Sequence, residues 1–289
     1  MTDAADDVAA VVVNHNAGGL LTDCVRSLRG EGIETIVVVD NGSTDGSLTT
    51  LTAADPAARV VRMPRNVGYG TAANRGVATT ATPYVLVLNP DTVVEPGLVK
   101  GLVAALERDP QLGLVAPRLD NPDGTLYPSV RHFPNLADAL GHAFLVDLVP
   151  NNRFTRRYRM LDWDHREARR VDWVSGACFL ARRPAFDAVG GFDEAYFMYM
   201  EDVDLCWRLG RAGWFAGYEP SVGIMHVQGV STARAPYRMV VAHHRSMLRF
   251  WWRSTTPSHR LLAPVVALGV GVRAAAEVAR RAIEARRVR

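Results

Sequence analysis

The sequence has few cysteines. Three cysteines in 289 residues are too few for a disulfide framework, and their spacing does not match that of metal ligands. Cys24 and Cys206 fall in expected helices, and Cys178 falls in an expected strand. We therefore expect three reduced and mostly buried thiols, as is usual in a cytoplasmic protein.

The sequence also lacks several targeting and nucleotide-binding signals. Its first residues, MTDAADD, are acidic and lead directly into an apolar run, which excludes a secretory signal. The apolar run LLAPVVALGVGV, residues 261–272, is far short of the roughly 20 residues that span a bilayer. No GKT or GKS occurs and no GxGxxG follows the first apolar run, so an ATPase or a dehydrogenase is disfavoured.

Positive charge is concentrated at the carboxyl end. The formal net charge is only +3, but from Arg260 onward the chain has seven Arg and two Glu. This distribution does not predict a nucleic-acid footprint along the chain. We expect a basic amphipathic helical tail over residues 256–289 that lies at an anionic membrane surface, helped by the aromatic and basic residues 249–253. Alternatively, the tail packs on residues 1–255 or on a second subunit of a homodimer.

Apolar runs of strand length alternate with amphipathic stretches of helix length up to about residue 118. This alternation is typical of an α/β fold with a parallel sheet. We expect strands near 8–14, 34–40, 59–63, 83–89 and 112–116, and helices near 19–30, 45–54, 70–79 and 97–108. Further along, the Asp-Gly pair within 118–131 predicts a hairpin. We also expect a strand over 173–183 and a helix over 199–213.

Three of the expected strands end on small polar or acidic residues. These clusters are Asn14 to Asn16, Asp40 to Ser47, and Asn89 to Asp91. The carboxyl ends of parallel strands form one crevice, where loop amides and helix N-termini bind ligands. The pattern therefore predicts a site for an anionic, nucleotide-linked small molecule. An Asp at position 40 suits a ribose hydroxyl or a base N–H, whereas the cluster at Asn14 also fits an ordinary polar turn.

Asp91 follows the apolar strand-like run PYVLVL. A carboxylate at the end of a buried strand is unfavourable unless it is paired or binds a cation. Mg²⁺ or Mn²⁺ that bridges phosphate oxygens is the usual partner of one or two such carboxylates. His226 is a candidate to complete this metal site, since imidazole suits Mn²⁺, although a single His is more often structural.

Glu201, Asp202 and Asp204 lie within four residues of one another. Such a cluster is disfavoured unless a cation, an Arg or a proton-transfer function compensates for the repulsion. Arg208 stands four residues after Asp204, so on a helix these two are expected to pair. Glu201 and Asp202 remain in the first turn, where one of them is a candidate general base for an incoming hydroxyl. Alternatively, they are acids that favour a helix N-terminus.

The ordered motifs VVVNHN, VVVDNGSTDGS, NVGYGTAANRG, LVLNPDT, WVSGACFLARR and GGFDEAYFMYMEDVDLCWR resemble glycosyltransferase family 2 from about residue 8 to 250. The resemblance implies a GT-A domain over 1–255, with a Rossmann-like, mostly parallel sheet and helices on both faces. It also implies Asp202 as catalytic base beside Glu201, and metal or diphosphate contacts from Asp91 and His226. Contacts to the nucleotide sugar are implied for Asn14, Asn16, Asp40, Asn66, Gly68, Asn74 and Asn89.

The chain departs from the family pattern at two places. The usual DxD motif is Asn89-Pro90-Asp91 here, so only one carboxylate is available to a metal. Many relatives have an Arg where Ala73 stands, so another Arg is expected to neutralise the diphosphate.

These motif variants most resemble the rhamnosyltransferase branch. That resemblance implies inverting, metal-dependent transfer of L-rhamnose from dTDP-rhamnose to N-acetylglucosaminyl-diphospho-polyprenol in synthesis of a cell-wall linkage unit. The enzyme would then be a peripheral protein at the cytoplasmic face of the membrane. Transfer of galactofuranose or N-acetylglucosamine to a lipid-linked or polysaccharide acceptor is an alternative. A non-catalytic scaffold that binds nucleotide sugars is another, but it would tolerate loss of the acidic residues that this chain retains.

Overall fold

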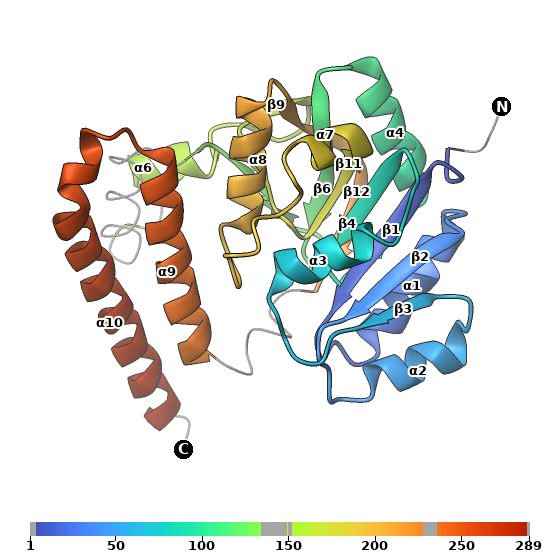
Figure 1. The fold of residues 1–289 in the computed structure, drawn as a ribbon, viewed down its shortest axis with the longest axis horizontal. Helices are drawn as coiled ribbons and strands as arrows, with labels where there is room; N and C mark the ends of the chain where they lie inside the picture. Colours follow the sequence, from blue (N-terminus) through green and yellow to red (C-terminus); the bar gives the residue numbers. More distant parts are fainter. Residues whose placement is uncertain (1–3, 134–148, 150–151, 228–235, 288–289) are drawn as a thin grey trace.

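The computed structural model describes residues 4–133, 149, 152–227 and 236–287. Strands and helices alternate in its first half: β1 (Val8–Asn14), α1 (Leu20–Gly30), β2 (Thr35–Asp40), α2 (Ser47–Ala54), β3 (Arg59–Arg62), α3 (Tyr69–Val77), β4 (Tyr84–Leu88), β5 (Thr92–Val94) and α4 (Leu98–Arg108). The first four strands pair in parallel in the order β3-β2-β1-β4. The predicted βαβ alternation is therefore confirmed (Figure 1).

The second half extends this sheet with mixed strand directions. Its elements are β6 (Leu112–Asp120), β7 (Leu126–Tyr127), β8 (Val130–Arg131), α6 (Arg153–Tyr158), β9 (Arg169–Val171), β10 (Trp173–Val174), β11 (Cys178–Arg182), α7 (Arg183–Ala188), α8 (Glu201–Arg211) and β12 (Phe215–His226). The full order is β3-β2-β1-β4-β11-β6-β12-β5, with β7 on β6 and β9 on β12. The β6–β7 hairpin is the one expected around the Asp-Gly pair.

The prediction of one strand over 173–183 is wrong. Strand β10 pairs with β8 in a separate two-stranded sheet, whereas β11 lies antiparallel between β4 and β6 in the main sheet. The chain turns at residues 175–177 between them. An apolar run with small residues at its centre reads as continuous in sequence, but here it passes from one sheet to the other.

Side-chain alternation along β1 divides the core into two layers. Ala10 and Val12 pack in a cluster with residues of α1, α2 and α4. Val11 and Val13 pack on the opposite face with residues of α3, α7 and α8. Successive strand residues point to opposite faces, so a strand buried on both faces reads as a continuous apolar run. Helices cover both faces of the sheet, as predicted, and all three cysteines are free and buried.

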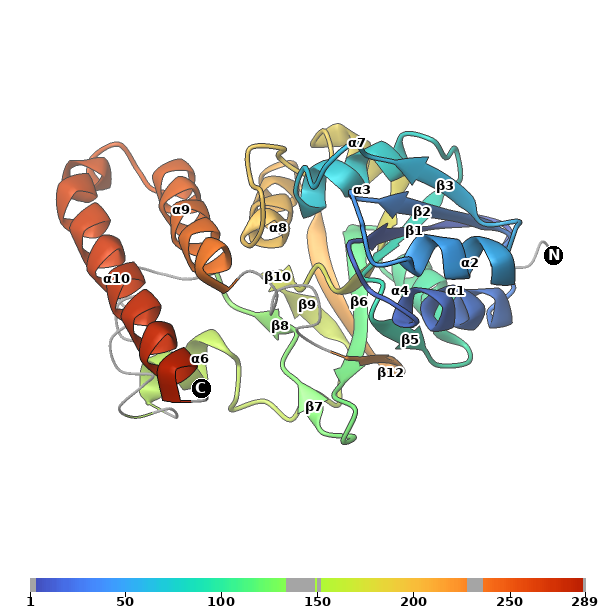
Figure 2. The same cartoon turned by 90° about the horizontal axis from the view of Figure 1, so that it is seen from below.

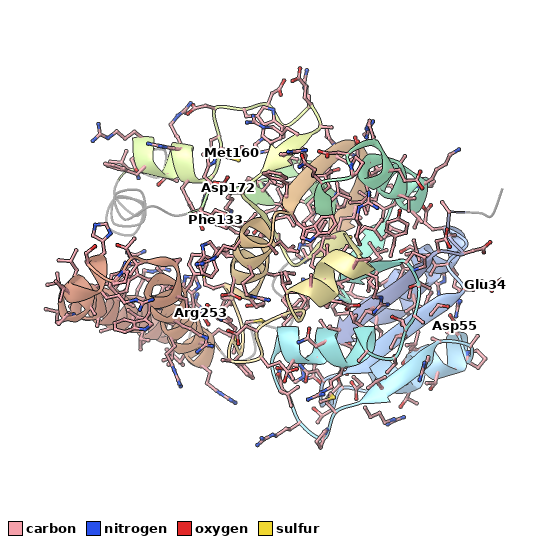
Figure 3. The ribbon with its side chains drawn as sticks, turned by 45° about the horizontal axis from the view of Figure 1, so that its top comes forward. Glu34, Asp55, Phe133, Met160, Asp172 and Arg253 are labelled. Carbon is pink, nitrogen blue, oxygen red and sulfur yellow. The ribbon has the colours of Figure 1, made fainter. Side chains whose placement is uncertain are left out.

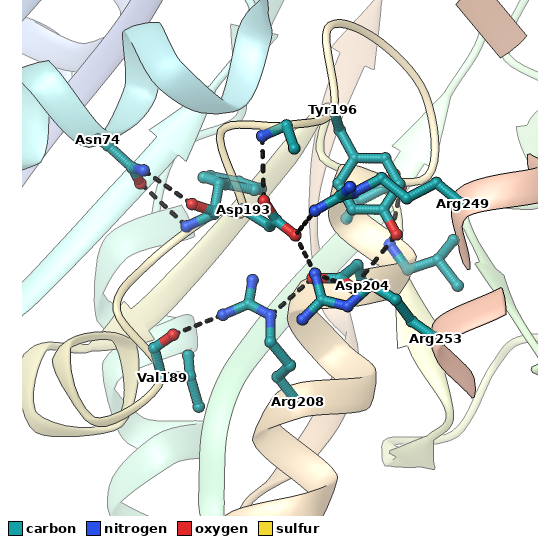
Figure 4. A network of polar contacts seen from close by, with 12 residues as sticks. Asn74, Val189, Asp193, Tyr196, Asp204, Arg208, Arg249 and Arg253 are labelled. Carbon is teal, nitrogen blue, oxygen red and sulfur yellow. Dashed lines mark hydrogen bonds and ion pairs between the residues drawn. The ribbon is translucent and has the colours of Figure 1, made fainter. Parts of the chain in front are cut away.

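Two helices, α9 (Pro236–Ser254) and α10 (Ala263–Arg287), form a hairpin beside α8 (Figures 1 and 2). Phe250 of α9 is buried in the core, and Ser246 donates a hydrogen bond to the Met198 carbonyl at 2.9 Å. Arg249 and Arg253 both contact Asp193, at the end of the loop that leads to α8 (Figure 4). Helix α9 is therefore anchored to the sheet domain, and α10 packs on α9.

Within the described residues, one helical stretch, His259–Ile283, is long and apolar enough by length and composition to cross a membrane. None of its apolar window is buried. The expectation that the apolar run at 261–272 is far too short is thus corrected. The helix continues without interruption through the alanine-rich residues that follow, and these lengthen the apolar stretch.

Candidate active site

Asn14 connects the ends of β1 and β2. Its side chain is fully buried, and its Nδ2 donates to Asp40 Oδ1 at 3.2 Å, Ser43 Oγ at 3.1 Å and Ser47 Oγ at 3.0 Å. The backbone N–H of Asn16 also donates to Ser43 Oγ, at 3.0 Å. The structure thus brings Asn14, Asn16 and Asp40 together at the carboxyl edge of the sheet, where their hydrogen bonds fix the shape of the loops.

Asn41, which the sequence analysis did not single out, connects this edge to the loop before α3. Its Nδ2 donates to Asn66 Oδ1 and to the Gly68 carbonyl, both at 3.2 Å, and its Oδ1 accepts from Val67 N at 2.9 Å. Gly68 has φ +97°, and a Cβ there would lie 2.5 Å from the Phe197 carbonyl oxygen. Only glycine fits this close approach. Asn66 and Gly68 are therefore beside Asn41 as parts of one rigid loop.

Asn74 makes its contacts away from these strand-end loops. Its Oδ1 accepts from Phe192 N and its Nδ2 donates to the Phe192 carbonyl, both at 2.9 Å (Figure 4). Both polar atoms of the amide thus hold α3 against the segment before α8. The structure gives Asn74 an anchoring role, and its contact with a nucleotide sugar stays a prediction.

Asp91 and His226 meet at the end of β4, although 135 residues separate them in sequence. Strand β12 runs antiparallel to β5 and places His226 opposite Thr92. His226 Nε2 then lies 3.2 Å from Asp91 Oδ1 and 3.4 Å from Asn89 Nδ2. Asp91 and His226 are both buried. The three residues that were expected near the diphosphate and the metal are therefore in contact.

This cluster fits a divalent cation that also binds substrate. The described residues contain no group of three His, Cys, Asp or Glu side chains that could hold a metal on their own. However, Nδ1 of buried His226 has no hydrogen-bond partner, and a carboxylate beside an imidazole is a donor set that suits Mn²⁺. Two side chains leave coordination positions for phosphate oxygens and water, as is common for Mg²⁺ and Mn²⁺ in nucleotide sites.

Glu201 and Asp202 occupy the first turn of α8. The two residues before them, Tyr199 and Met200, have φ values of +66° and +67°, which is unfavourable for side chains of this size. Strain of this kind is retained where the surrounding structure imposes it, often at active sites. Asp202 Oδ2 accepts from Gly176 N at 3.0 Å and its Oδ1 accepts from Val203 N at 2.8 Å. The helix start and the β10–β11 turn thus hold Asp202 in place.

The two carboxyl groups have different surroundings. Burial and then the negative charge of Asp202 raise the pKa of Glu201 to about 8, and Glu201 Oε2 has no hydrogen-bond partner. Burial also raises the pKa of Asp202, but the N–H groups of Gly176 and Val203 and the charge of Arg131 oppose that rise. Hydrogen bonds from amides stabilise a carboxylate. Of the two carboxyl groups, Glu201 therefore holds its proton more tightly than Asp202 does.

Tyr69 lies beside the Gly176 turn that binds Asp202, and the sequence analysis gave it no individual role. Its hydroxyl donates to the Gly176 carbonyl at 2.6 Å. Its pKa is raised by burial and then by nearby negative charges, which include Glu201, Asp202 and Asp91. These carboxylates are thus close enough to Tyr69 to act on it together. The only sequence signal for Tyr69 was its place within NVGYG.

Asp204 is structural, as expected from its spacing to Arg208. The two form an ion pair at 2.6 Å, and Asp204 is completely buried. Tyr196 donates to Asp204 Oδ1 at 3.3 Å, and Arg253 Nη1 lies 3.4 Å from the same atom (Figure 4). Of the three clustered carboxylates, this one is neutralised by arginines and joins α8 to α9.

Comparison with known proteins gives consistent results. Residues 9–190 match glycosyl transferase family 2. The chain is 39% identical over 269 residues, 86% of its length and 87% of the relative's, to an N-acetylglucosaminyl-diphospho-decaprenol L-rhamnosyltransferase from Mycobacterium tuberculosis (strain ATCC 25618 / H37Rv). It is 31% identical over 255 residues, 85% of its length and 44% of the relative's, to a pre-mycofactocin glycosyltransferase from the same strain.

Among solved structures, mannosyltransferase PcManGT from Pyrobaculum calidifontis in complex with GDP-Man and Mn²⁺ is similar, with a TM-score of 0.56. Sequence identity to it is 15%, and the match covers 96% of this chain and 75% of that one. At this identity the likeness shows the fold alone. The fold is GT-A, as the sequence motifs implied.

Proposed function

Because this chain belongs to glycosyl transferase family 2 and is therefore a glycosyltransferase, we propose that it transfers L-rhamnose from dTDP-rhamnose to an N-acetylglucosaminyl-diphospho-polyprenol. The relative named N-acetylglucosaminyl-diphospho-decaprenol L-rhamnosyltransferase matches over 87% of its own length, which supports the sugar and the acceptor of this proposal. The observation that carries the proposal is the turn at residues 175–177: Asn89 N donates to its Ala177 carbonyl at 2.9 Å, and its Gly176 N donates to Asp202 Oδ2 at 3.0 Å. The candidate base and the candidate diphosphate site thus both adjoin this turn.

In the proposed reaction, Asp202 accepts the proton of the acceptor hydroxyl as that oxygen attacks the anomeric carbon from the face opposite the leaving diphosphate. Asp91 and His226 would hold a divalent cation, which when bound neutralises charge on the departing nucleoside diphosphate. Protonated Glu201 limits repulsion beside Asp202 and keeps that carboxylate ionised. Tyr69 holds the Gly176 turn, whose N–H fixes the orientation of the base.

Helix α10 is the proposed membrane attachment of the enzyme. Leu261, in the short 3₁₀ helix His259–Leu262 directly before α10, is 83% exposed, and Val265, Leu268 and Val272 of α10 are 69%, 69% and 57% exposed. They follow one another at spacings of four, three and four residues and so form a stripe on one helical face. An exposed apolar stripe on a basic helix suits the interface of an anionic membrane. A polyprenyl acceptor resides in the membrane, so this attachment would hold the cleft near its substrate at the cytoplasmic face.

A donor screen with purified protein tests the proposal. N-acetylglucosaminyl-diphospho-lipid is supplied as acceptor, with dTDP-rhamnose, UDP-galactofuranose or UDP-N-acetylglucosamine as donor, in Mg²⁺, in Mn²⁺ or in EDTA. We expect product from dTDP-rhamnose in either metal and none in EDTA. Preference for another donor would contradict the rhamnose assignment, undiminished transfer in EDTA would contradict metal dependence, and donor binding without transfer of any sugar would favour the scaffold alternative.

A further inference from the structure

Two arginines near Asp202 have no acidic partner among the residues that the structure describes. Arg131 ends β8, and Arg159 directly follows α6. Nε of Arg159 is buried and has no hydrogen-bond partner. By contrast, Arg208 faces the carboxylate of Asp204 at 2.6 Å.

Aromatic rings hold Arg131 in place. Its guanidinium carbon lies 5.3 Å from the ring centre of Trp173 and 5.6 Å from that of Tyr158. Its N–H groups reach the Pro128 carbonyl at 3.4 Å and the Tyr127 hydroxyl at 3.5 Å. Rings and neutral oxygens orient a guanidinium and attract it weakly, but they do not cancel its charge. Arg131 is thus fixed in orientation, and the charge of Asp202 acts on it only from beyond ion-pair distance.

The two arginines meet through Tyr158, the residue directly before Arg159. The Arg131 guanidinium packs on the Tyr158 ring, and the neighbouring His132 N donates to the Tyr158 carbonyl at 3.2 Å. Burial lowers the pKa of Arg159, and the positive charge of Arg131 lowers it further. Holding two cations together in a partly desolvated place is unfavourable without an anion. A ligand with two or more negative charges would relieve this repulsion and satisfy the buried Nε.

The pair adjoins the proposed base. Arg131 stands directly opposite Trp173 in the β8–β10 ladder, and β10 leads into Gly176, whose N–H donates to Asp202. On its other side, Tyr127 packs edge-on to the His226 ring with 6.4 Å between centroids. Figures 2 and 3 show this region between α8 and α6: β8 and β10 lie there in Figure 2, and the neighbouring residues 133, 160 and 172 are labelled in Figure 3.

We propose that Arg131 and Arg159 bind a diphosphate, namely that of the lipid-linked acceptor, an assignment that rests on the proposed function. Guanidinium groups bind phosphate oxygens in pairs through parallel N–H bonds. In an inverting transfer the donor diphosphate leaves on the side opposite the attacking hydroxyl, and Asp91 with His226 serves that side. The acceptor diphosphate is joined to the sugar that carries the hydroxyl, so it lies on the Asp202 side of the site, where the β8–β10 ladder places Arg131.

Binding measurements on the full chain test the assignment without requiring turnover. Titration calorimetry uses two probes: farnesyl diphosphate, a lipid diphosphate without sugar, and dTDP with Mn²⁺. Arg159→Gln is expected to weaken the binding of farnesyl diphosphate at least tenfold and to leave the affinity for dTDP within about twofold of wild type. Arg159→Lys is expected to weaken the binding of farnesyl diphosphate less. The matched control is Arg166→Gln, since that side chain is 85% exposed. Unchanged binding of farnesyl diphosphate to Arg159→Gln would overturn the proposal.

The two sources of diphosphate give different outcomes. If Arg159→Gln weakens the binding of dTDP as much as that of farnesyl diphosphate, the arginine pair binds the donor diphosphate and the acceptor assignment is overturned. Arg131→Lys keeps the positive charge between the rings. This variant is expected to retain the wild-type melting temperature and to weaken only the binding of farnesyl diphosphate. Failure of the enzyme to transfer rhamnose would refute the proposed function separately, because the calorimetric comparison between probes decides the role of the arginines in either case.

In an active enzyme the same variants distinguish binding from folding. We expect Arg159→Gln to raise the KM for N-acetylglucosaminyl-diphospho-lipid about tenfold while kcat changes little. The KM for an uncharged alkyl N-acetylglucosaminide should be unchanged, because it has no diphosphate to bind. An equal increase for both acceptors would show general damage to the cleft and would contradict a diphosphate site.

Discussion

Replacing Glu201 by Gln should make the protein more stable than wild type at alkaline pH. Burial and the charge of Asp202 raise the pKa of Glu201 from 4.5 to about 8. Because the folded pKa is above the unfolded value, the folded state holds this proton more tightly, and its stabilising contribution is present below the unfolded pKa and is lost as pH rises through the folded pKa. At about 1.4 kcal/mol per pKa unit, the loss of unfolding free energy is on the order of a few kcal/mol near pH 9.

Urea unfolding at pH 5, 7 and 9 measures this effect. Gln cannot ionise, so the difference in unfolding free energy between the Glu201→Gln variant and wild type should increase in favour of the variant from the lowest to the highest pH. The matched control is Glu107→Gln, the same change at an exposed position of α4, which should give a small difference with little dependence on pH. A difference for Glu201→Gln that is equally small at all three pH values would refute a buried Glu201 with a raised pKa.

Three further changes test other parts of the account. Asp91→Asn should weaken nucleotide-sugar binding in Mn²⁺ but not in EDTA, and an unchanged response to Mn²⁺ would remove Asp91 from the metal site. Gly68→Ala should lower the unfolding free energy by roughly 2 to 4 kcal/mol, from the left-handed backbone and the overlap with a carbonyl oxygen, and a loss below about 0.5 kcal/mol in urea would contradict that overlap. Replacing Leu261, Val265 and Leu268 of the apolar stripe by Gln should reduce co-sedimentation with anionic liposomes several-fold and leave donor binding intact, whereas undiminished sedimentation would exclude the stripe as the attachment.

The sheet edge could be predicted because local patterns determine it. Apolar runs that alternate with amphipathic segments give parallel strands, and parallel strands bring Asn14, Asp40 and Asn89 to one edge. The pairing of Asp204 with Arg208 followed from helical spacing alone. These inferences need only residues within one element or the ends of neighbouring strands.

Contacts between distant segments were not predictable in the same way. Tyr69 reaches the Gly176 carbonyl across 107 positions of sequence, and nothing local to either residue indicates the other. Arg131 is placed beside Asp202 only because β8 pairs with β10, and β10 was read as part of a longer strand. Arg131 and Arg159 therefore became candidates for a contact to the acceptor diphosphate only in three dimensions. The arginine expected to neutralise the donor diphosphate in place of one at Ala73 stays a prediction.

The most direct test of the central claim is the turnover of Asp202→Asn with dTDP-rhamnose and N-acetylglucosaminyl-diphospho-lipid. Loss of a general base should lower kcat about 10²- to 10⁴-fold, while calorimetry shows dTDP-rhamnose bound with nearly wild-type affinity in Mn²⁺. Turnover within about tenfold of wild type would contradict the account, because the proton of the acceptor hydroxyl would then be accepted elsewhere.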